Sequence, residues 1–232
     1  MKRILLLACI AGMAVSPALA GMTAHLSAGH GDPFPIGQGG YYTVYRTGDM
    51  AAWNAAGLSA DFRTFCVEQR VFYDGTQYNV TIDDQVLQLG PKPIQTFTKT
   101  LYANYILAPG STIGQNTIGE SGFSNRAFQA LIWDSQGTIS GTAGQFGGGH
   151  ANAYAWLTGP EKLLYITYHD FAVNNPRTSD LWRVHALNLW SGTPYTGGDM
   201  QSQLVLTVPA PAAALLGAVG LGLVGWIKRR VS

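Results

Sequence analysis

The chain has 232 residues, of which 12% are charged and 47% are hydrophobic, and its formal net charge is +1. This length suits one compact domain with extensions, and the low charge and many aromatic residues exclude a disordered or nucleic-acid-binding chain. Its two cysteines are too few for a disulfide-stapled scaffold.

The first 20 residues have the three parts of a secretory signal peptide: a basic start, an apolar stretch and a small-residue cleavage site. Ala18 and Ala20 form the cleavage site, and the mature chain would begin at Gly21. We therefore expect residues 1–20 to be removed on export. Because Cys9 leaves with them, the exported chain retains a single cysteine.

Residues 21–208, the body of the chain, are expected to begin with mainly β structure. Residues 21–40 are rich in Gly and Pro, which indicates an irregular leader. Residues 41–46 predict a short strand. Residues 62–72 and 76–83 flank the turn signal Asp74-Gly75, which predicts a β-hairpin.

Helices are expected in the middle of the chain. Residues 97–107 have apolar side chains four apart, and Pro109-Gly110 would end that helix. A second helix is expected over residues 124–135, with Ser124 as its N-cap, and a third, short helix over residues 151–157.

The rest of the body returns to β structure. Strands are expected over residues 163–168, 181–190 and 203–208, and the Gly-rich segment 141–149 is expected to be a mobile loop. The predicted fold class is α+β: one β-rich domain over residues 41–208, with hairpins around a small helical insertion.

The C-terminal end, residues 209–232, joins a Pro-x-Pro motif, an apolar run and a basic cluster. These parts are Pro209 and Pro211, residues 212–227, and Lys228, Arg229 and Arg230. The run would form about 24 Å of helix, short of the roughly 30 Å hydrocarbon core, so it would span a membrane only with help from flanking residues. The order of parts resembles the PEP-CTERM sorting signal of Gram-negative bacteria, although Ala210 stands where that signal usually has Glu. An ordinary single-span anchor is the alternative.

This resemblance implies export through signal peptidase and an exosortase, a membrane cysteine protease. The chain would be held in the inner membrane by its C-terminal helix, and after processing it would reach the cell surface or the extracellular, exopolysaccharide-containing matrix. Between the two ends lie nine basic and 13 acidic residues, a net charge of −4. That balance offers no basic patch for nucleic acid.

The lone exported cysteine, Cys66, follows Phe65 in a predicted strand. Gln129 lies on a predicted helix after Phe128, with Trp133 four residues further on. An aromatic-Cys motif on a strand and a Gln-x-x-apolar-Trp motif on a helix resemble the thioester domains of Gram-positive surface adhesins, although Phe128 stands where that family often has Thr.

The resemblance implies that the Cys66 thiol and the Gln129 carboxamide condense, with loss of ammonia, into an internal thioester. Phe65, Phe128 and Trp133 would form a dry shell around it. A surface amine or hydroxyl would then attack, leaving the chain covalently attached to its target. This is single-use attachment and not enzymatic turnover, and we expect no cofactor and no metal.

Three other interpretations remain open for Cys66: an inert buried thiol, an intermolecular disulfide, and a cysteine hydrolase. A hydrolase needs an oriented histidine, and no histidine lies in a recognisable signature. The acidic pair Asp83-Asp84 lacks the other spaced ligands of a calcium loop. The many aromatic residues leave a non-covalent carbohydrate-binding or structural matrix protein as the main rival function.

Overall fold

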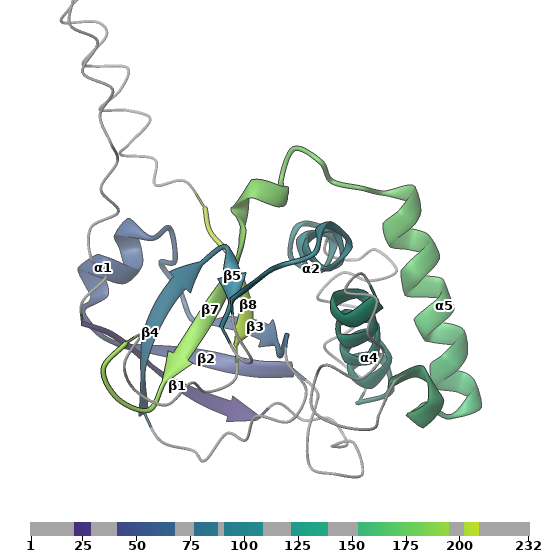
Figure 1. Cartoon of the computed structure of the whole chain (residues 1–232), viewed down its shortest axis with the longest axis horizontal. Helices are drawn as coiled ribbons and strands as arrows, with labels where there is room; N and C mark the ends of the chain where they lie inside the picture. The colour runs from purple at the N-terminus through teal and green to yellow at the C-terminus, as the bar shows by residue number, and fades with distance from the viewer. Residues whose placement is uncertain are drawn as a thin grey trace, which may run out of the picture.

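The computed structural model describes residues 21–28, 41–67, 77–87, 91–108, 122–138, 153–194 and 202–208. Within these residues the fold is α+β: an antiparallel six-stranded sheet lies beside a group of helices (Figure 1). The helices are α1 (Met50–Ala55), α2 (Thr96–Leu107), α4 (Gly122–Thr138) and α5 (Gly159–Asn174), with 3-10 turns η1 (Ala153–Trp156) and η2 (Leu181–Arg183).

The main sheet has the strand order β3-β2-β1-β4-β7-β8. Its strands are β1 (Met22–Ala28), β2 (Tyr41–Gly48), β3 (Phe62–Phe65), β4 (Gln77–Asp83), β7 (Val184–Trp190) and β8 (Gln203–Leu206). Two short strands, β5 (Gln85–Val86) and β6 (Lys92–Pro93), form a separate pair.

The two edge strands of this sheet meet, so the sheet closes on itself. An antiparallel bridge pairs Cys66, just after β3, with Gln203 of β8. The N–H of Val67 donates to the carbonyl oxygen of Ser202 at 2.9 Å. Closure leaves neither edge open at this end and gives the sheet an inner and an outer face.

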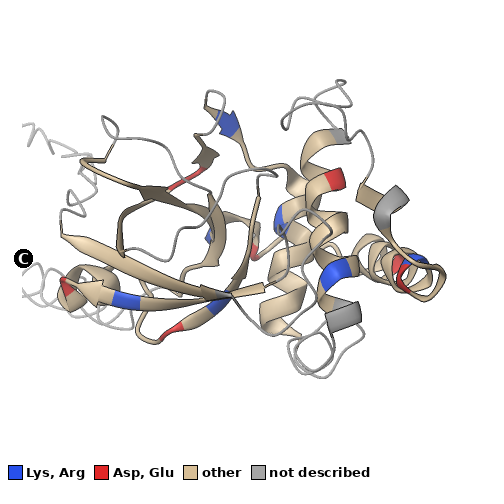
Figure 2. Ribbon diagram, turned by 90° about the horizontal axis from the view of Figure 1, so that it is seen from below, with Lys and Arg blue, Asp and Glu red and all other residues tan. Residues whose placement is uncertain are grey.

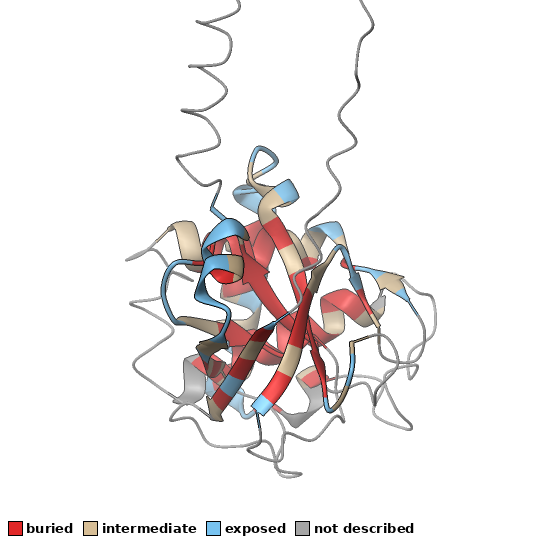
Figure 3. Cartoon of the chain, turned by 90° about the vertical axis from the view of Figure 1, so that its left-hand side faces the viewer, coloured by how far each residue is buried: buried red, intermediate tan, exposed pale blue. Residues whose placement is uncertain are grey.

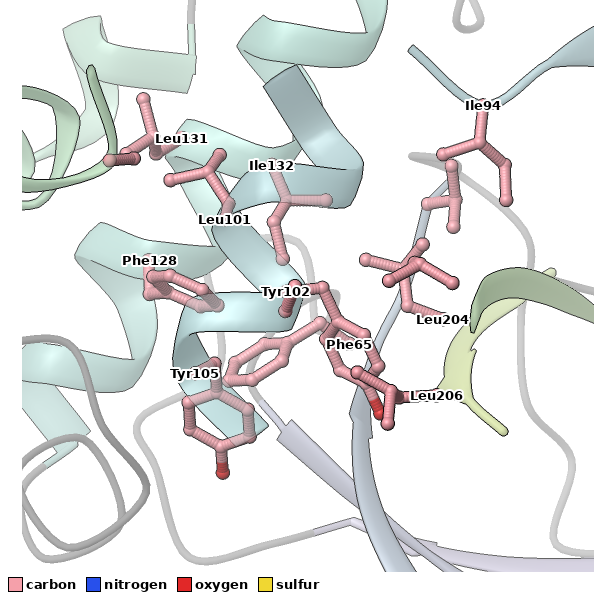
Figure 4. Close-up of a cluster of buried hydrophobic side chains, with 14 of the residues drawn as sticks. Phe65, Ile94, Leu101, Tyr102, Tyr105, Phe128, Leu131, Ile132, Leu204 and Leu206 are labelled. Carbon is pink, nitrogen blue, oxygen red and sulfur yellow. The ribbon is translucent and has the colours of Figure 1, made fainter. Parts of the chain in front are cut away.

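Alternating side chains divide the hydrophobic core between those two faces. The inner face carries Cys66 together with strand residues such as Leu26, Val80 and Val205. The outer face carries Phe65, which packs in the core that joins the sheet to α2, α4 and α5 (Figure 4). Figure 3 shows buried residues along the strands of the sheet. Cys66 therefore lies at the boundary between the two cores.

Several predicted elements are confirmed. The strands expected over residues 41–46, 76–83 and 203–208 appear as β2, β4 and β8. The helix expected over residues 97–107 is α2. The second predicted helix is α4, although it begins at Gly122, before the expected cap. The short third helix is the 3-10 turn η1, and β7 starts three residues later than predicted because η2 precedes it.

Two strand predictions are wrong. Strands β3 and β4 do not form a hairpin, because β2 and β1 lie between them in the sheet. Residues 163–168, expected to be a strand, lie within α5. A capping box between Thr158 and Glu161 and a proline in the first turn start that helix, and they outweigh the β-like apolar run.

The sequence analysis missed β1 and α1, as well as the short pair β5 and β6. Part of the expected irregular leader is β1, which pairs with β2 on one side and β4 on the other. Helix α1 is short, and it begins where the Asp49 carboxylate accepts hydrogen bonds from the N–H groups of Ala51 and Ala52.

The predicted signal peptide, the sorting tail, the Asp74-Gly75 turn and the segment 141–149 lie outside the described residues. Among the helices that the structure does describe, none has both the length and the apolar character needed to cross a membrane.

Candidate functional site at Cys66 and Gln129

The structure brings Cys66 and Gln129 into direct contact although 63 residues separate them. The backbone N–H of Cys66 donates to the side-chain oxygen Oε1 of Gln129 at 3.1 Å. The side-chain nitrogen Nε2 of Gln129 donates to the carbonyl oxygen of Cys66 at 2.7 Å. Both residues are completely buried. One carboxamide is thus clamped by hydrogen bonds, through both of its polar atoms, to the backbone N–H and C=O of a single, completely buried residue.

The strand geometry explains why the Cys66 backbone is open to this clamp. The β2–β3 ladder ends at Phe65. At the bridge to β8, Val67 and not Cys66 donates across the strands, so the polar backbone groups of Cys66 point away from β8. Helix α4 then supplies a partner for these groups through Gln129, which avoids the cost of burying them unpaired.

The sulfur of Cys66 has a neighbour that sequence reasoning missed. The side-chain nitrogen Nε2 of Gln203 lies 3.4 Å from Cys66 Sγ. Gln203 is also fully buried, and it is the direct partner of Cys66 in the bridge between the edge strands. Nothing in the predicted strand at residues 203–208 indicated this contact, because it arises from closure of the sheet.

Two of the three predicted shell residues pack together beside the site. The rings of Phe65 and Phe128 are 4.9 Å apart in an edge-to-face arrangement, and Tyr105 packs on both, at 5.1 and 5.5 Å (Figure 4). Burial raises the pKa of Tyr105 to about 12, so its hydroxyl stays neutral near pH 7.

The third predicted shell residue, Trp133, lies in a different place. It is buried one turn after Gln129, in a separate cluster with Ala130, Ala153 and Leu157, between α4 and η1. Its ring therefore packs against η1, one turn further along α4, and is not part of the cluster that contains Phe65 and Phe128.

Polar contacts fix α4 relative to its neighbours. Arg126 lies 3.3 Å from the buried carboxylate of Glu161 at the start of α5. Asp134 accepts hydrogen bonds from the N–H groups of Ala153 and Tyr154 and from the hydroxyl of Tyr165. Burial raises the pKa of Asp134, and these three donors oppose the rise. Gln129 is therefore presented from a helix that is held at both ends.

A second amide on α4 lies one turn before Gln129. Asn125 is completely buried, and neither polar atom of its side chain has a hydrogen-bond partner among the described residues. Its spacing places it on the same helix face as Gln129. Burying an amide without hydrogen bonds costs folding free energy, so we expect the stability of the fold to be sensitive to substitution of Asn125.

Other metal-ligating and histidine side chains also lie within the described residues. No group of three or more His, Cys, Asp or Glu side chains gathers there. His169 and His185 each face an aspartate, at 3.1 Å from Asp170 and 3.0 Å from Asp84. Figure 2 shows charged residues scattered over the sheet and helices.

Comparison of the chain with protein-family models, with curated proteins and with solved structures gave no match. The resemblance to thioester domains therefore depends on the sequence motifs alone, Phe65-Cys66 and Gln129 with Trp133.

Proposed function

We propose that the chain is an exported protein of the cell surface or extracellular matrix, released through an exosortase, which attaches covalently to its target through a Cys66–Gln129 thioester. The pairing of the Gln129 carboxamide with the backbone N–H and C=O of Cys66 carries the proposal. It holds the acyl group next to the residue that bears the nucleophile, as such a condensation requires.

Thioester formation uses only these two side chains. The sulfur Sγ of Cys66 attacks the amide carbon Cδ of Gln129, the C–N bond breaks, and the amide nitrogen leaves as ammonia after taking the thiol proton. Negative charge develops on Oε1 during the attack. The Cys66 N–H already donates to that oxygen at 3.1 Å, so it would act as an oxyanion donor.

Attachment then reverses the role of the sulfur. An amine or hydroxyl of the target attacks Cδ, the C–S bond breaks, and Cys66 regains a thiol. Because Gln129 is completely buried, we expect small amines to react faster than bulky ones. Burial also limits hydrolysis of the resting thioester, since water is kept from the acyl carbon.

The rival function is non-covalent: a carbohydrate-binding or structural matrix protein with an inert Cys66. One observation favours it, because the Gln129 clamp also satisfies two buried backbone groups and so has a purely structural use.

Intact mass separates the two functions. The exported, mature protein is weighed before and after methylamine treatment, with a free-thiol assay alongside. The thioester predicts a mass lower by one ammonia, and a thiol that appears only when methylamine adds. Cys66→Ala and Gln129→Ala should remove both signals, whereas the control Gln136→Ala, on the same helix, should retain them. A full mass with a thiol that titrates only on denaturation would refute the covalent function.

A further inference from the structure

The donor that faces the Cys66 sulfur has a chemical use within the proposed reaction. Gln203 Nε2 lies 3.4 Å from Sγ, and both side chains are completely buried. Because the two residues are directly paired between antiparallel strands, their side chains project to the same face of the sheet. The sheet closure itself thus delivers an N–H donor to the sulfur.

We propose that Gln203 activates the Cys66–Gln129 thioester by stabilising the sulfur as it leaves. This inference rests on the proposed thioester. When an amine attacks Cδ, the C–S bond breaks and sulfur takes the electron pair. The amine then gives up a proton, which ends on the sulfur. The N–H of Gln203 donates to the sulfur throughout this step.

The benefit arises because the hydrogen bond strengthens as the reaction proceeds. A thioester sulfur is a weak acceptor, whereas a thiolate carries a charge, and hydrogen bonds to charged groups are about twice as strong as neutral ones. A contact that is stronger in the transition state than in the ground state accelerates the step. The amide is neutral, so it adds no charge to the buried site at rest.

Two hydrogen-bond donors would then stabilise different atoms of the reacting group. The backbone N–H of Cys66 stabilises the acyl oxygen of Gln129, at one end of the reacting group. The side chain of Gln203 stabilises the sulfur at the other end. Neither donor is a titratable group. The intact thioester can therefore be activated without an acidic or basic side chain beside it.

The test compares how fast methylamine opens the thioester in the wild type and in Gln203→Met, which keeps an unbranched side chain but lacks the N–H. The second-order rate of methylamine opening is followed by thiol release and by mass. We expect Gln203→Met to form the thioester and open it about 10 to 100 times more slowly, because one hydrogen bond to a charged group is lost. The control Gln136→Met removes a buried glutamine elsewhere and should open at the wild-type rate.

A pH profile distinguishes a chemical role from a structural one. After opening, the alkylation rate of Cys66 is measured against pH, and we expect the apparent pKa of the thiol to be higher in Gln203→Met than in wild type. Gln203→Glu provides a second variant if the first fails to fold. Its carboxylate would repel the thiolate, so its opening rate should fall below that of wild type increasingly as the pH rises.

The outcomes distinguish failure of the proposed thioester from failure of the proposed role of Gln203. A wild-type protein of full mass refutes the proposed function and this inference together. A wild type that forms the thioester, beside a folded Gln203 variant that opens at the same rate with the same thiol pKa, overturns the role of Gln203 alone.

Discussion

Opening the proposed thioester should reduce the stability of the fold by an amount that can be estimated from the chain. The bond would link Cys66 on one edge strand to Gln129 on α4 and would close a loop of 63 residues. A covalent link of that span lowers the entropy of the unfolded chain, and by the loop-closure relation used for disulfides it contributes about 4 kcal/mol. Methylamine removes the link and leaves the rest of the chain unchanged.

The assay is equilibrium urea unfolding before and after methylamine treatment. We expect a lower midpoint after treatment, and also a steeper dependence on urea, because the unfolded chain becomes less compact without the link. Cys66→Ala, which cannot form the link, should unfold identically with and without methylamine. A wild type whose mass shows the thioester but whose midpoint stays unchanged would refute the reasoning about loop closure.

Three further predictions concern positions around the site. Gln136→Ala should destabilise the fold by about 1–3 kcal/mol, because it removes the hydrogen-bond partner of two part-buried backbone groups; a loss below about 0.5 kcal/mol in urea unfolding would contradict this. Asn125→Leu should raise stability by about 1–3 kcal/mol, since it removes an unpartnered buried amide, and a lower melting temperature would refute it. Gly57→Ala should destabilise by at least about 1–3 kcal/mol, because Gly57 has φ +78° and an added Cβ would lie 2.0 Å from the carbonyl oxygen of Val208; an unchanged thermal midpoint would show that this contact relaxes easily.

The local elements of this fold could be predicted better than their pairing. The helical spacing in α2 and the alternation in β4 are properties of single segments, and both elements appear where expected. The Asp74-Gly75 signal predicted a hairpin between neighbouring strands, but the sheet inserts β2 and β1 between β3 and β4. Pairing depends on distant segments, and one turn signal carries no information about them.

The candidate site shows the same division. Cys66 and Gln129 were selected from two short motifs, and the structure places them together, but the motifs do not identify the donor at the sulfur. Gln203 reaches Cys66 only because the sheet closes. The resemblance to thioester domains implies that Trp133 lies in the shell. The structure places its ring in the cluster that joins α4 to η1, apart from the cluster of Phe65 and Phe128.

Helix α4 carries two glutamines, Gln129 and Gln136, whose carboxamides each hydrogen-bond to backbone groups of another segment. Gln136 therefore serves as a comparison for the proposed chemistry at Gln129. The amide of Gln136 accepts from the N–H of Gln95 at 3.0 Å and donates to the carbonyl oxygen of Pro93 at 3.0 Å, much as Gln129 does with Cys66. A clamp of this kind is therefore no evidence of a thioester by itself.

What distinguishes the Gln129 clamp is the side chain of the residue that it holds. There the clamped residue carries a thiol, and a second buried amide, that of Gln203, donates to the sulfur. The Gln136 carboxamide instead holds the backbone of Gln95 and Pro93, neither of which carries a thiol. It also accepts from the hydroxyl of Thr98 at 3.2 Å, so it joins α4 to α2 and to the segment before α2. Substituting each glutamine in turn therefore separates the stability that the clamp provides from the reactivity that the sulfur adds.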